Sequence, residues 1–247
     1  MAHILGKNST IAFILFLLAA SGCFRPPGER EFKQGLAYYG DKRYNEAIAE
    51  FTKAIAANSG YAAAYYQRGN AYLGKGNPQQ AIADYSKTLQ LMPDYIDAYF
   101  WRAIAYHMDG DLTNSLSDFN KVIKLAPNNA AAYNNRGLVY YQQNKFDAAI
   151  ADYNKAIALE PYYAEGYYNR GLTYATHGDY SQAISDYTKA IQFDPNFGPA
   201  FSGRAFAYYV TGDYDKAWND LYTAKAYGIS PSPDFLEELK QASGREQ

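Results

Sequence analysis

The sequence predicts an all-α solenoid in which pairs of helices stack along the chain. Residues 130–163 contain two amphipathic helical patterns joined by a polar turn at residues 143–145, and the segment closes at Pro161. The same pattern returns 34 residues later, starting at Ala164. Self-similarity at a fixed period of this length is typical of stacked helical repeats. The hydrophobic content of 48% is sufficient for the continuous core that such a stack buries.

Six copies of this unit account for most of the chain. We place them at residues 28–61, 62–95, 96–129, 130–163, 164–197 and 198–231. Four copies carry proline at their thirty-second place, where it ends the second helix because proline disfavours helical geometry in the residue before it. These prolines are Pro93, Pro127, Pro161 and Pro195. The first and last copies deviate there, as expected of terminal repeats, whose outer face has no neighbour.

Residues 232–247 follow the last copy and predict a capping helix with a short tail. Ser232 is suited to the N-cap and Pro233 to the first helical position. The apolar face of this helix would be formed by Phe235, Leu236 and Leu239. We expect it to cover the exposed end of the sixth copy, with Trp218 packed beneath it.

Small residues occupy the eighth and the twentieth place of every copy. They are Gly35, Gly69, Ala103, Gly137, Gly171 and Ala205 at the eighth place, and Ala47, Ala81, Ser115, Ala149, Ala183 and Ala217 at the twentieth. Small side chains at both places allow the two helices of a copy to approach closely, whereas larger ones would overpack the contact. Aromatic residues recur at the fourth, eleventh and twenty-fourth places. Most of the 27 tyrosines are therefore expected to be framework residues.

Arginine and aspartate recur together. Five copies have arginine at the seventh place and aspartate at the twenty-third, and the first copy lacks both. The pairs are Arg68 with Asp84, Arg102 with Asp118, Arg136 with Asp152, Arg170 with Asp186, and Arg204 with Asp220. Because arginine binds carboxylate bidentately, we expect a ladder of ion pairs that fixes the register of the helices. The alternative is a row of arginines that captures acidic ligands, and we favour the structural interpretation because each arginine has an acid available.

The repeated places from residue 28 to residue 231 resemble the tetratricopeptide repeat (TPR). The resemblance implies a right-handed superhelix whose concave groove is lined by the first helix of each copy and binds a partner protein or peptide. The residues at the inward-facing places are Tyr66, Gln67, Asn70, Phe100, Trp101, Ile104, Asn134, Asn135, Leu138, Tyr141, Tyr168, Asn169, Leu172 and Phe206.

Two features of this set are candidates for specific contacts. Asn135 and Asn169 stand at the same place of adjacent copies, and an asparagine amide both donates to and accepts from a peptide backbone. Phe100 and Trp101 lie together in an atypical copy, and large aromatic side chains in a cleft are frequent binding anchors. Two interpretations are open for each: a binding residue, or a solvated asparagine and a tryptophan that packs between repeats.

The N-terminus predicts export and lipid attachment. A weakly basic start precedes the apolar run at residues 11–20, which is about half the length needed to span a bilayer. Residues 20–23, Ala-Ser-Gly-Cys, resemble a bacterial lipobox, in which residues 1–22 are removed and Cys23 is lipidated. The alternative is an ordinary export signal with a chance cysteine, but Cys23 is the single cysteine of the chain.

This resemblance implies a protein anchored to the cell envelope by several acyl chains, with residues 23–27 as a short tether. Phe24 in place of the aspartate that retains such proteins at the inner membrane points to the outer membrane, facing the periplasm. TPR lipoproteins of this kind include pilotins for pilus secretins and periplasmic adaptors. We therefore expect a membrane-anchored scaffold that binds a protein or peptide.

Composition and motifs argue against catalysis, cofactors and nucleic acid. The net charge of −2 offers no basic surface for nucleic acid. His107 and His177 are isolated, and no nucleophile–base pair, phosphate loop or metal-ligand spacing is present. We expect neither a metal nor a cofactor. The alternative function is a membrane-proximal enzyme or carbohydrate-binding module that uses the aromatic groove.

Overall fold

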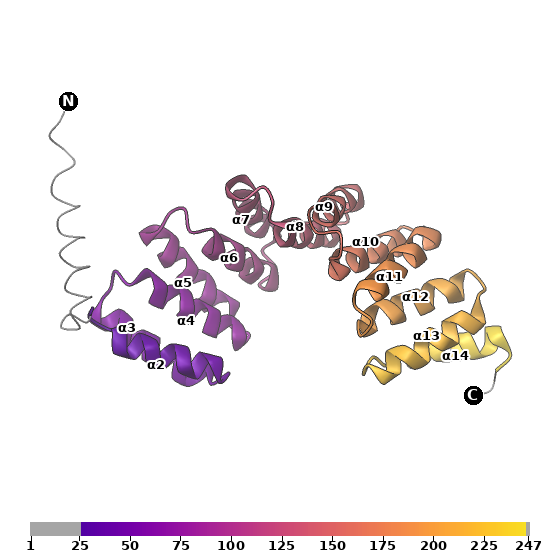
Figure 1. Cartoon of the computed structure of the whole chain (residues 1–247), viewed down its shortest axis with the longest axis horizontal. Coiled ribbons are helices and arrows are strands. Elements are labelled where there is room, and N and C mark those ends of the chain that lie inside the picture. Colours follow the sequence, from indigo (N-terminus) through magenta and orange to yellow (C-terminus); the bar gives the residue numbers. More distant parts are fainter. Residues whose placement is uncertain (1–25, 246–247) are drawn as a thin grey trace, which may run out of the picture. The chain divides into compact units, whose positions relative to one another are not determined.

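The computed structural model describes residues 26–245, and these residues form helices and turns without a strand (Figure 1). The predicted all-α repeat fold is confirmed. The predicted signal segment and Cys23 lie outside the described residues. Within the described chain, no helix combines the length and apolarity needed to cross a membrane.

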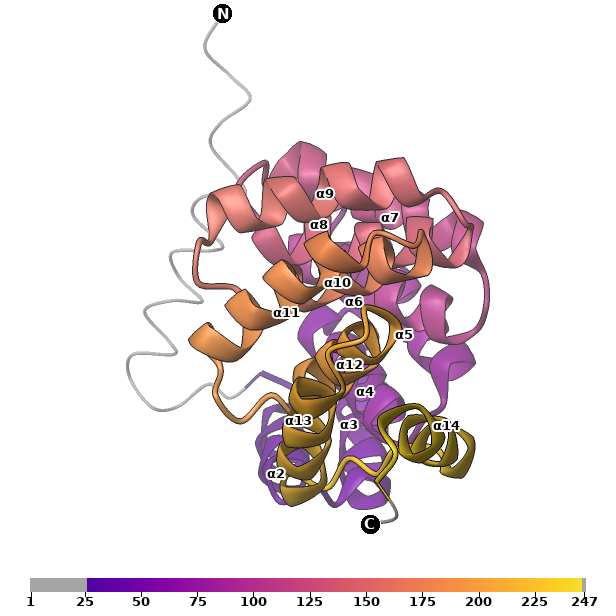
Figure 2. The same ribbon diagram turned by 90° about the vertical axis from the view of Figure 1, so that its right-hand side faces the viewer.

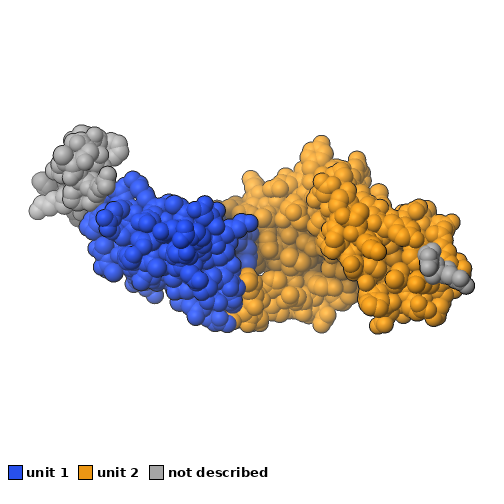
Figure 3. Space-filling view, turned by 90° about the horizontal axis from the view of Figure 1, so that it is seen from below, with its two compact units in different colours: residues 1–105 blue, residues 106–247 orange. Residues whose placement is uncertain are grey.

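The chain divides into two compact units, residues 1–105 and 106–247, coloured separately in Figure 3. The described part of the first unit holds α2 (Glu29–Gly40), α3 (Tyr44–Ala57), α4 (Ala62–Gly74), α5 (Pro78–Leu91) and most of α6 (Ile96–Met108). The second holds α7 (Leu112–Leu125), α8 (Ala130–Gln142), α9 (Phe146–Leu159), α10 (Ala164–Thr176), α11 (Tyr180–Phe193), α12 (Gly198–Val210), α13 (Tyr214–Ala226) and α14 (Pro233–Ser243).

In four of the helix pairs an aromatic ring of the second helix lies against a glycine of the first. A methyl group built on Gly137 of α8 would come within 2.6 Å of the Tyr153 ring of α9, and one on Gly69 of α4 within 2.8 Å of the Tyr85 ring of α5. Both tyrosines are fully buried. Glycine is therefore preferred at positions 69 and 137, because the tyrosine ring at the twenty-fourth place fills the space that a side chain at the eighth place would need.

The tight turn inside each pair uses one residue in the left-handed conformation. Gly76, Gly110, Gly178 and Gly212 occupy this fifteenth place with φ between 76° and 89°. In the other two turns the residue is not glycine: Lys42 has φ 58° and Asn144 has φ 57°. A side chain in this region is strained, so Lys42 stands where glycine is preferred.

In the second unit the first helices of the pairs form one layer. Helix α10 contacts both α8 and α12, and α9 and α11 each pack between the first helix of their own pair and that of the next. No comparable contact joins α9 to α11, or α11 to α13, in this part of the described chain. The places predicted to line a groove thus lie on helices that are direct neighbours.

Helix α14 lies beside α13, as both views show (Figures 1 and 2). Ser232 is its N-cap, with the side-chain oxygen accepting from the Phe235 amide at 3.2 Å. Leu239 is fully buried in a cluster with Trp218, and Trp218 Nε1 donates to Ser243 Oγ at 3.0 Å. The capping role predicted for this helix is confirmed.

Candidate functional site

The second unit contains a groove of about 540 Å³ between α10, α12 and the chain leading into α14. We call it the α10–α12 groove. Its lining residues are Tyr168, Leu172, Ala175, Thr176, Tyr187, Pro199, Ser202, Gly203, Phe206, Ile229, Ser230, Pro231, Ser232 and Phe235. Three of the residues predicted from the repeat pattern, Tyr168, Leu172 and Phe206, lie together in this lining.

The lining of the α10–α12 groove carries no acidic or basic side chain among its described residues. It combines aromatic and aliphatic groups with the hydroxyls of Thr176, Ser202, Ser230 and Ser232. Apolar walls with a few hydrogen-bonding groups are typical of sites that bind uncharged organic or peptide groups.

Helix α12 is shaped to leave this space open. Gly203 stands at the place that holds Asn135 and Asn169 in the two preceding copies. A methyl group on Gly203 would come within 2.7 Å of the Tyr187 ring of α11. The Tyr187 ring therefore forms part of the floor of the groove beneath Gly203, and a larger residue at position 203 would displace it.

Phe206 is the most exposed apolar side chain of the predicted set, with 42% of its surface accessible. Its ring lies 5.5 Å from that of Phe235 on α14 and 6.3 Å from those of Tyr180 and Tyr209. These edge-on and tilted contacts hold the ring at the groove wall while its outer face stays accessible.

The asparagines of the second unit are engaged within the fold. Asn134 and Asn169 are 4% and 8% exposed, and Asn169 Nδ2 donates to Asn134 Oδ1 at 2.9 Å. Asn135 Nδ2 donates to the Ala131 carbonyl of its own helix at 2.8 Å. Hydroxyls pair between the same helices, with Tyr141 Oη 2.9 Å from Thr176 Oγ1. The Asn134–Asn169 and Tyr141–Thr176 contacts join α8 to α10, whereas the Asn135 bond lies within α8.

The remaining predicted residue of this unit is Leu138, which is half-buried on α8. Tyr168 is also half-buried, and its ring lies 5.0 Å from Phe197 and 5.8 Å from Tyr187. Burial raises the pKa of Tyr168 above its ordinary value, so its phenol stays neutral.

In the first unit the predicted residues form a separate cluster on α4. The Tyr66 ring lies 5.1 Å from Tyr95, and burial raises its pKa to about 12. Asn70 Nδ2 donates to Gln67 Oε1 at 3.0 Å, and Asn70 Oδ1 accepts from the Tyr85 hydroxyl at 2.7 Å. On α6, the Trp101 side chain is 39% exposed with its ring edge-on to Phe100, and Ile104 is half-buried.

The predicted arginine–aspartate pairing is present in four copies. Each arginine donates from Nε and Nη2 to both carboxylate oxygens, at 2.7 to 2.9 Å, in Arg68–Asp84, Arg136–Asp152, Arg170–Asp186 and Arg204–Asp220. The two residues of the fifth pair, Arg102 and Asp118, belong to different units. Within the first unit, Arg102 Nη1 donates to Ser86 Oγ at 3.0 Å.

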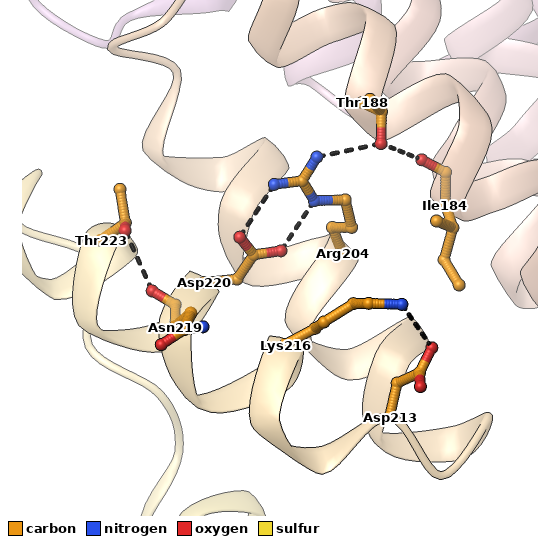
Figure 4. Close-up of polar contacts among 8 residues, drawn as sticks. All are labelled: Ile184, Thr188, Arg204, Asp213, Lys216, Asn219, Asp220 and Thr223. Carbon is orange, nitrogen blue, oxygen red and sulfur yellow. Dashed lines mark hydrogen bonds and ion pairs between the residues drawn. The ribbon is translucent and has the colours of Figure 1, made fainter.

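A third contact of these arginines was missed from the sequence. In each case Nη1 donates to a polar side chain 16 residues earlier, at the twenty-fifth place of the preceding copy. The acceptors are Thr52, Ser86, Asn120, Asn154 and Thr188. Figure 4 shows Arg204 between Asp220 and Thr188, which in turn donates to the Ile184 carbonyl at 2.7 Å. The sequence signal for this contact is the recurring Ser, Thr or Asn at the twenty-fifth place.

The described chain offers no group of three or more His, Cys, Asp and Glu residues that could hold a metal ion. His177 is exposed at the end of α10, and His107 is half-buried near the end of α6.

The fold defines a class: a helical-repeat protein built from stacked helix pairs, with a groove beside the first helices α10 and α12. Family profiles of the tetratricopeptide repeat match residues 62–95 and 164–197 in one case and 32–61 in another, and a TPR repeat profile matches 109–144 and 137–178. The chain belongs to the tetratricopeptide repeat proteins. A comparison with curated proteins gives no match.

Solved structures with a similar fold include MamA, with 27% identity, a TM-score of 0.57, and coverage of 71% of this chain and 96% of that one. The pilF protein of Pseudomonas aeruginosa has 22% identity and a TM-score of 0.68, over 74% of this chain and 85% of its own. YrrB, described as a TPR protein with an unusual peptide-binding site, has 20% identity and a TM-score of 0.59, over 75% and 94%.

Proposed function

We propose that this protein is a lipid-anchored adaptor of the bacterial cell envelope that holds an extended, uncharged segment of a partner protein in the α10–α12 groove. The observation that carries this proposal is the groove lining, which joins Leu172, Phe206 and Phe235 to several hydroxyls without a charged group. TPR folds are suited to binding proteins and peptides, and the peptide-binding site named for YrrB supports this use of the fold.

The lining sets the chemistry of the bound segment. A charged side chain that enters the groove would lose its hydration and find no ionic partner there. Burying even an uncharged polar group without a partner costs about 2 kcal/mol or more, and burying an unpaired charge costs more than that. Apolar side chains of the partner would instead bury against Leu172 and Phe206. The hydroxyl of Ser202 would pair with a backbone amide or carbonyl of the partner.

The chain at one rim favours an extended partner. Between α13 and α14 the residues Ile229, Ser230, Pro231 and Ser232 are not helical, and Ser232 has extended geometry with φ −62° and ψ 145°. Ser230 and Ser232 are exposed. An extended peptide beside this segment would pair with its main-chain groups in the way a strand adds to a sheet edge.

The anchoring half of the proposal rests on the sequence at Cys23. Lipidation there would place the helical array next to the membrane through the short tether of residues 23–27, and Phe24 favours the outer membrane, with the array facing the periplasm. An adaptor at this location would concentrate its partner at the membrane surface during envelope assembly.

Groove binding is tested by recovering partners from cells that produce the tagged protein, comparing wild type with Leu172→Ala/Phe206→Ala. The control is Tyr162→Ala, since Tyr162 is 79% exposed elsewhere in the second unit. We expect the double variant to lose the partner, the control to retain it, and high salt to leave the interaction intact. Recovery undiminished in the double variant, with its thermal unfolding unchanged, would reject the groove.

Lipid attachment is tested by mass analysis of the mature N-terminus. We expect an acylated Cys23, and in Cys23→Ser a chain that leaves the membrane fraction. An unmodified N-terminus that starts elsewhere would contradict the anchoring half while leaving the groove untouched.

A further inference from the structure

A second cavity lies between α13 and α14 and shares Ser230 and Pro231 with the α10–α12 groove. Its volume is about 470 Å³, and we call it the Trp218 pocket. Its lining residues are Trp218, Leu221, Tyr222, Lys225, Ser230, Pro231, Pro233, Leu236 and Lys240. Trp218 and Tyr222 stack with their ring centroids 5.7 Å apart, and 54% of Tyr222 is exposed.

The α13 wall of this pocket departs from the repeat at three places. Trp218 stands where the five earlier copies have isoleucine or leucine, and Tyr222 where they have threonine, serine or asparagine. Lys225 stands at a place that is otherwise isoleucine or leucine. These residues are spaced four and three apart, so they share one face of α13.

In the preceding copy the same face joins the next helix pair. Thr188 accepts a hydrogen bond from Arg204 of α12, and Ile191 packs against a cluster that includes Ala200 of α12. On α13 this face meets the single helix α14 instead of a further helix pair within the described residues. A purely apolar capping helix would cover this face of α13 completely. Here two aromatic rings and two lysine side chains line an open cavity instead.

The charges of the pocket have one sign. Lys225 from α13 and Lys240 from α14 are its only charged lining residues, and neither forms an ion pair within residues 26–245. The rest of the wall is almost wholly hydrocarbon. An anion attached to an apolar group is the complement of such a wall, since the ring stack buries the apolar part and the ammonium groups meet the charge.

We propose that the Trp218 pocket binds a single-chain amphiphile with a carboxylate head, its hydrocarbon lying against Trp218, Tyr222 and Leu236 and its carboxylate between Lys225 and Lys240. A peptide fits less well because each of its residues buries an amide and a carbonyl that need partners, and the wall offers few. The variants that test the two proposals do not overlap: Lys225 and Lys240 line the Trp218 pocket and not the α10–α12 groove, whereas Leu172 and Phe206 line the groove and not the pocket. Failure of one proposal therefore leaves the other standing.

The test uses dodecanoate below its micelle concentration and reads the fluorescence of Trp218. The chain has two tryptophans, so the Trp101→Phe background isolates the signal. We expect saturable binding of one molecule per chain with a change in Trp218 emission. Lys225→Gln/Lys240→Gln should weaken this binding at least about tenfold, because hydrogen bonds to charged groups contribute about 1.5 kcal/mol or more.

The matched control is Lys145→Gln/Lys155→Gln, which makes the same change in net charge at exposed positions of the second unit. It should bind dodecanoate like the parent. Three results would overturn the proposal: no saturable binding of dodecanoate, equal binding of dodecanol, or equal weakening in both lysine variants. Displacement of dodecanoate by a short apolar peptide with a free carboxyl terminus, at matched concentration, would reassign the pocket to a chain end. Thermal unfolding of each variant establishes that the fold is retained.

Discussion

The Arg136 guanidinium donates two parallel hydrogen bonds to the Asp152 carboxylate, Nε to Oδ2 and Nη2 to Oδ1, both at 2.7 Å. The two side chains are 18% and 8% exposed, so the pair is largely withdrawn from water. Nη1 of the same arginine donates to Asn120 on α7. One side chain thus joins the two helices of its own pair to the second helix of the preceding pair, and the same arrangement recurs along the array.

Removing the Asp152 charge should destabilise the second unit. Asp152→Asn leaves the guanidinium largely buried without its counter-charge, and loss of one partner of a buried ion pair costs about 3 kcal/mol or more. The thermal midpoint should fall, as measured by circular dichroism. Glu160→Gln, which makes the same charge change at an exposed position after α9, should alter it little. Unchanged stability together with improved binding of acidic ligands would instead favour an arginine row built for capture.

Two threonine variants test the hydrogen bond from arginine Nη1 to the preceding copy. Thr188→Val keeps the shape of the side chain and removes the acceptor for Arg204 Nη1. Thr223 also donates to a carbonyl of its own helix, that of Asn219, but accepts no hydrogen bond from an arginine in the described chain (Figure 4). We expect Thr188→Val to lower the free energy of unfolding by about 1 kcal/mol more than Thr223→Val. Equal effects in urea denaturation would show that the contact does not join the copies.

Relief of turn strain should stabilise the first unit. Lys42 has φ 58° in the turn between α2 and α3, where four other copies use glycine. Lys42→Gly should raise the free energy of unfolding by about 1 kcal/mol, because a side chain in the left-handed region is penalised by about that amount. Asn144→Gly should gain less, since asparagine tolerates this region. Lys42→Ala keeps the penalty and serves as the control; a gain equal to that of glycine would show that the turn is unstrained.

Buried tyrosines should make the fold sensitive to alkali. Burial raises the pKa of Tyr66 and Tyr163 to about 12, and it raises the pKa of Tyr85, Tyr153 and Tyr187 further. In the unfolded chain tyrosine ionises at about pH 10, so as the pH rises the unfolded state loses these protons before the folded state does. The stabilising contribution is therefore complete below about pH 10 and is lost as pH rises toward the folded-state values.

Tyr153→Phe tests this assignment. Tyr153 is fully buried, and its hydroxyl lies near Thr173 without a hydrogen bond of good geometry among residues 26–245. At neutral pH the variant should be as stable as the parent or slightly more stable, since an unpaired buried hydroxyl is unfavourable. Above about pH 10 its unfolding free energy should fall less steeply than that of the parent. Parallel curves for the two proteins would contradict the assignment.

The sequence predicted the repeat, the capping helix and the ion-pair ladder because each follows from a short-range or strictly periodic pattern. Gly137 and Tyr153 repeat at fixed places, and Arg136 and Asp152 appear and vanish together along the copies. Ser232 and Pro233 mark the start of α14 by local capping chemistry alone.

The site could be predicted only in part, because a repeat pattern shows which way a place faces and not what each side chain there contacts. Asn134 and Asn169 share the inward face, yet their mutual hydrogen bond depends on the spacing of α8 and α10. The contribution of Ile229 and Phe235 to the α10–α12 groove arises from the path of the chain after α13, which breaks the repeat. The remaining predicted positions, including Trp101, stay predictions.

The most direct test of the adaptor proposal is site-specific photocrosslinking in the producing cell, with the reactive group at Ser202 in the α10–α12 groove or at exposed Ser185 on α11. If the partner binds in the groove, we expect crosslinks from position 202 to an uncharged stretch of one partner. These crosslinks should persist at high salt and disappear in Leu172→Ala/Phe206→Ala. Position 185 should give none of these products. The same crosslinks from both positions, or a crosslinked stretch rich in charged residues, would contradict the adaptor proposal.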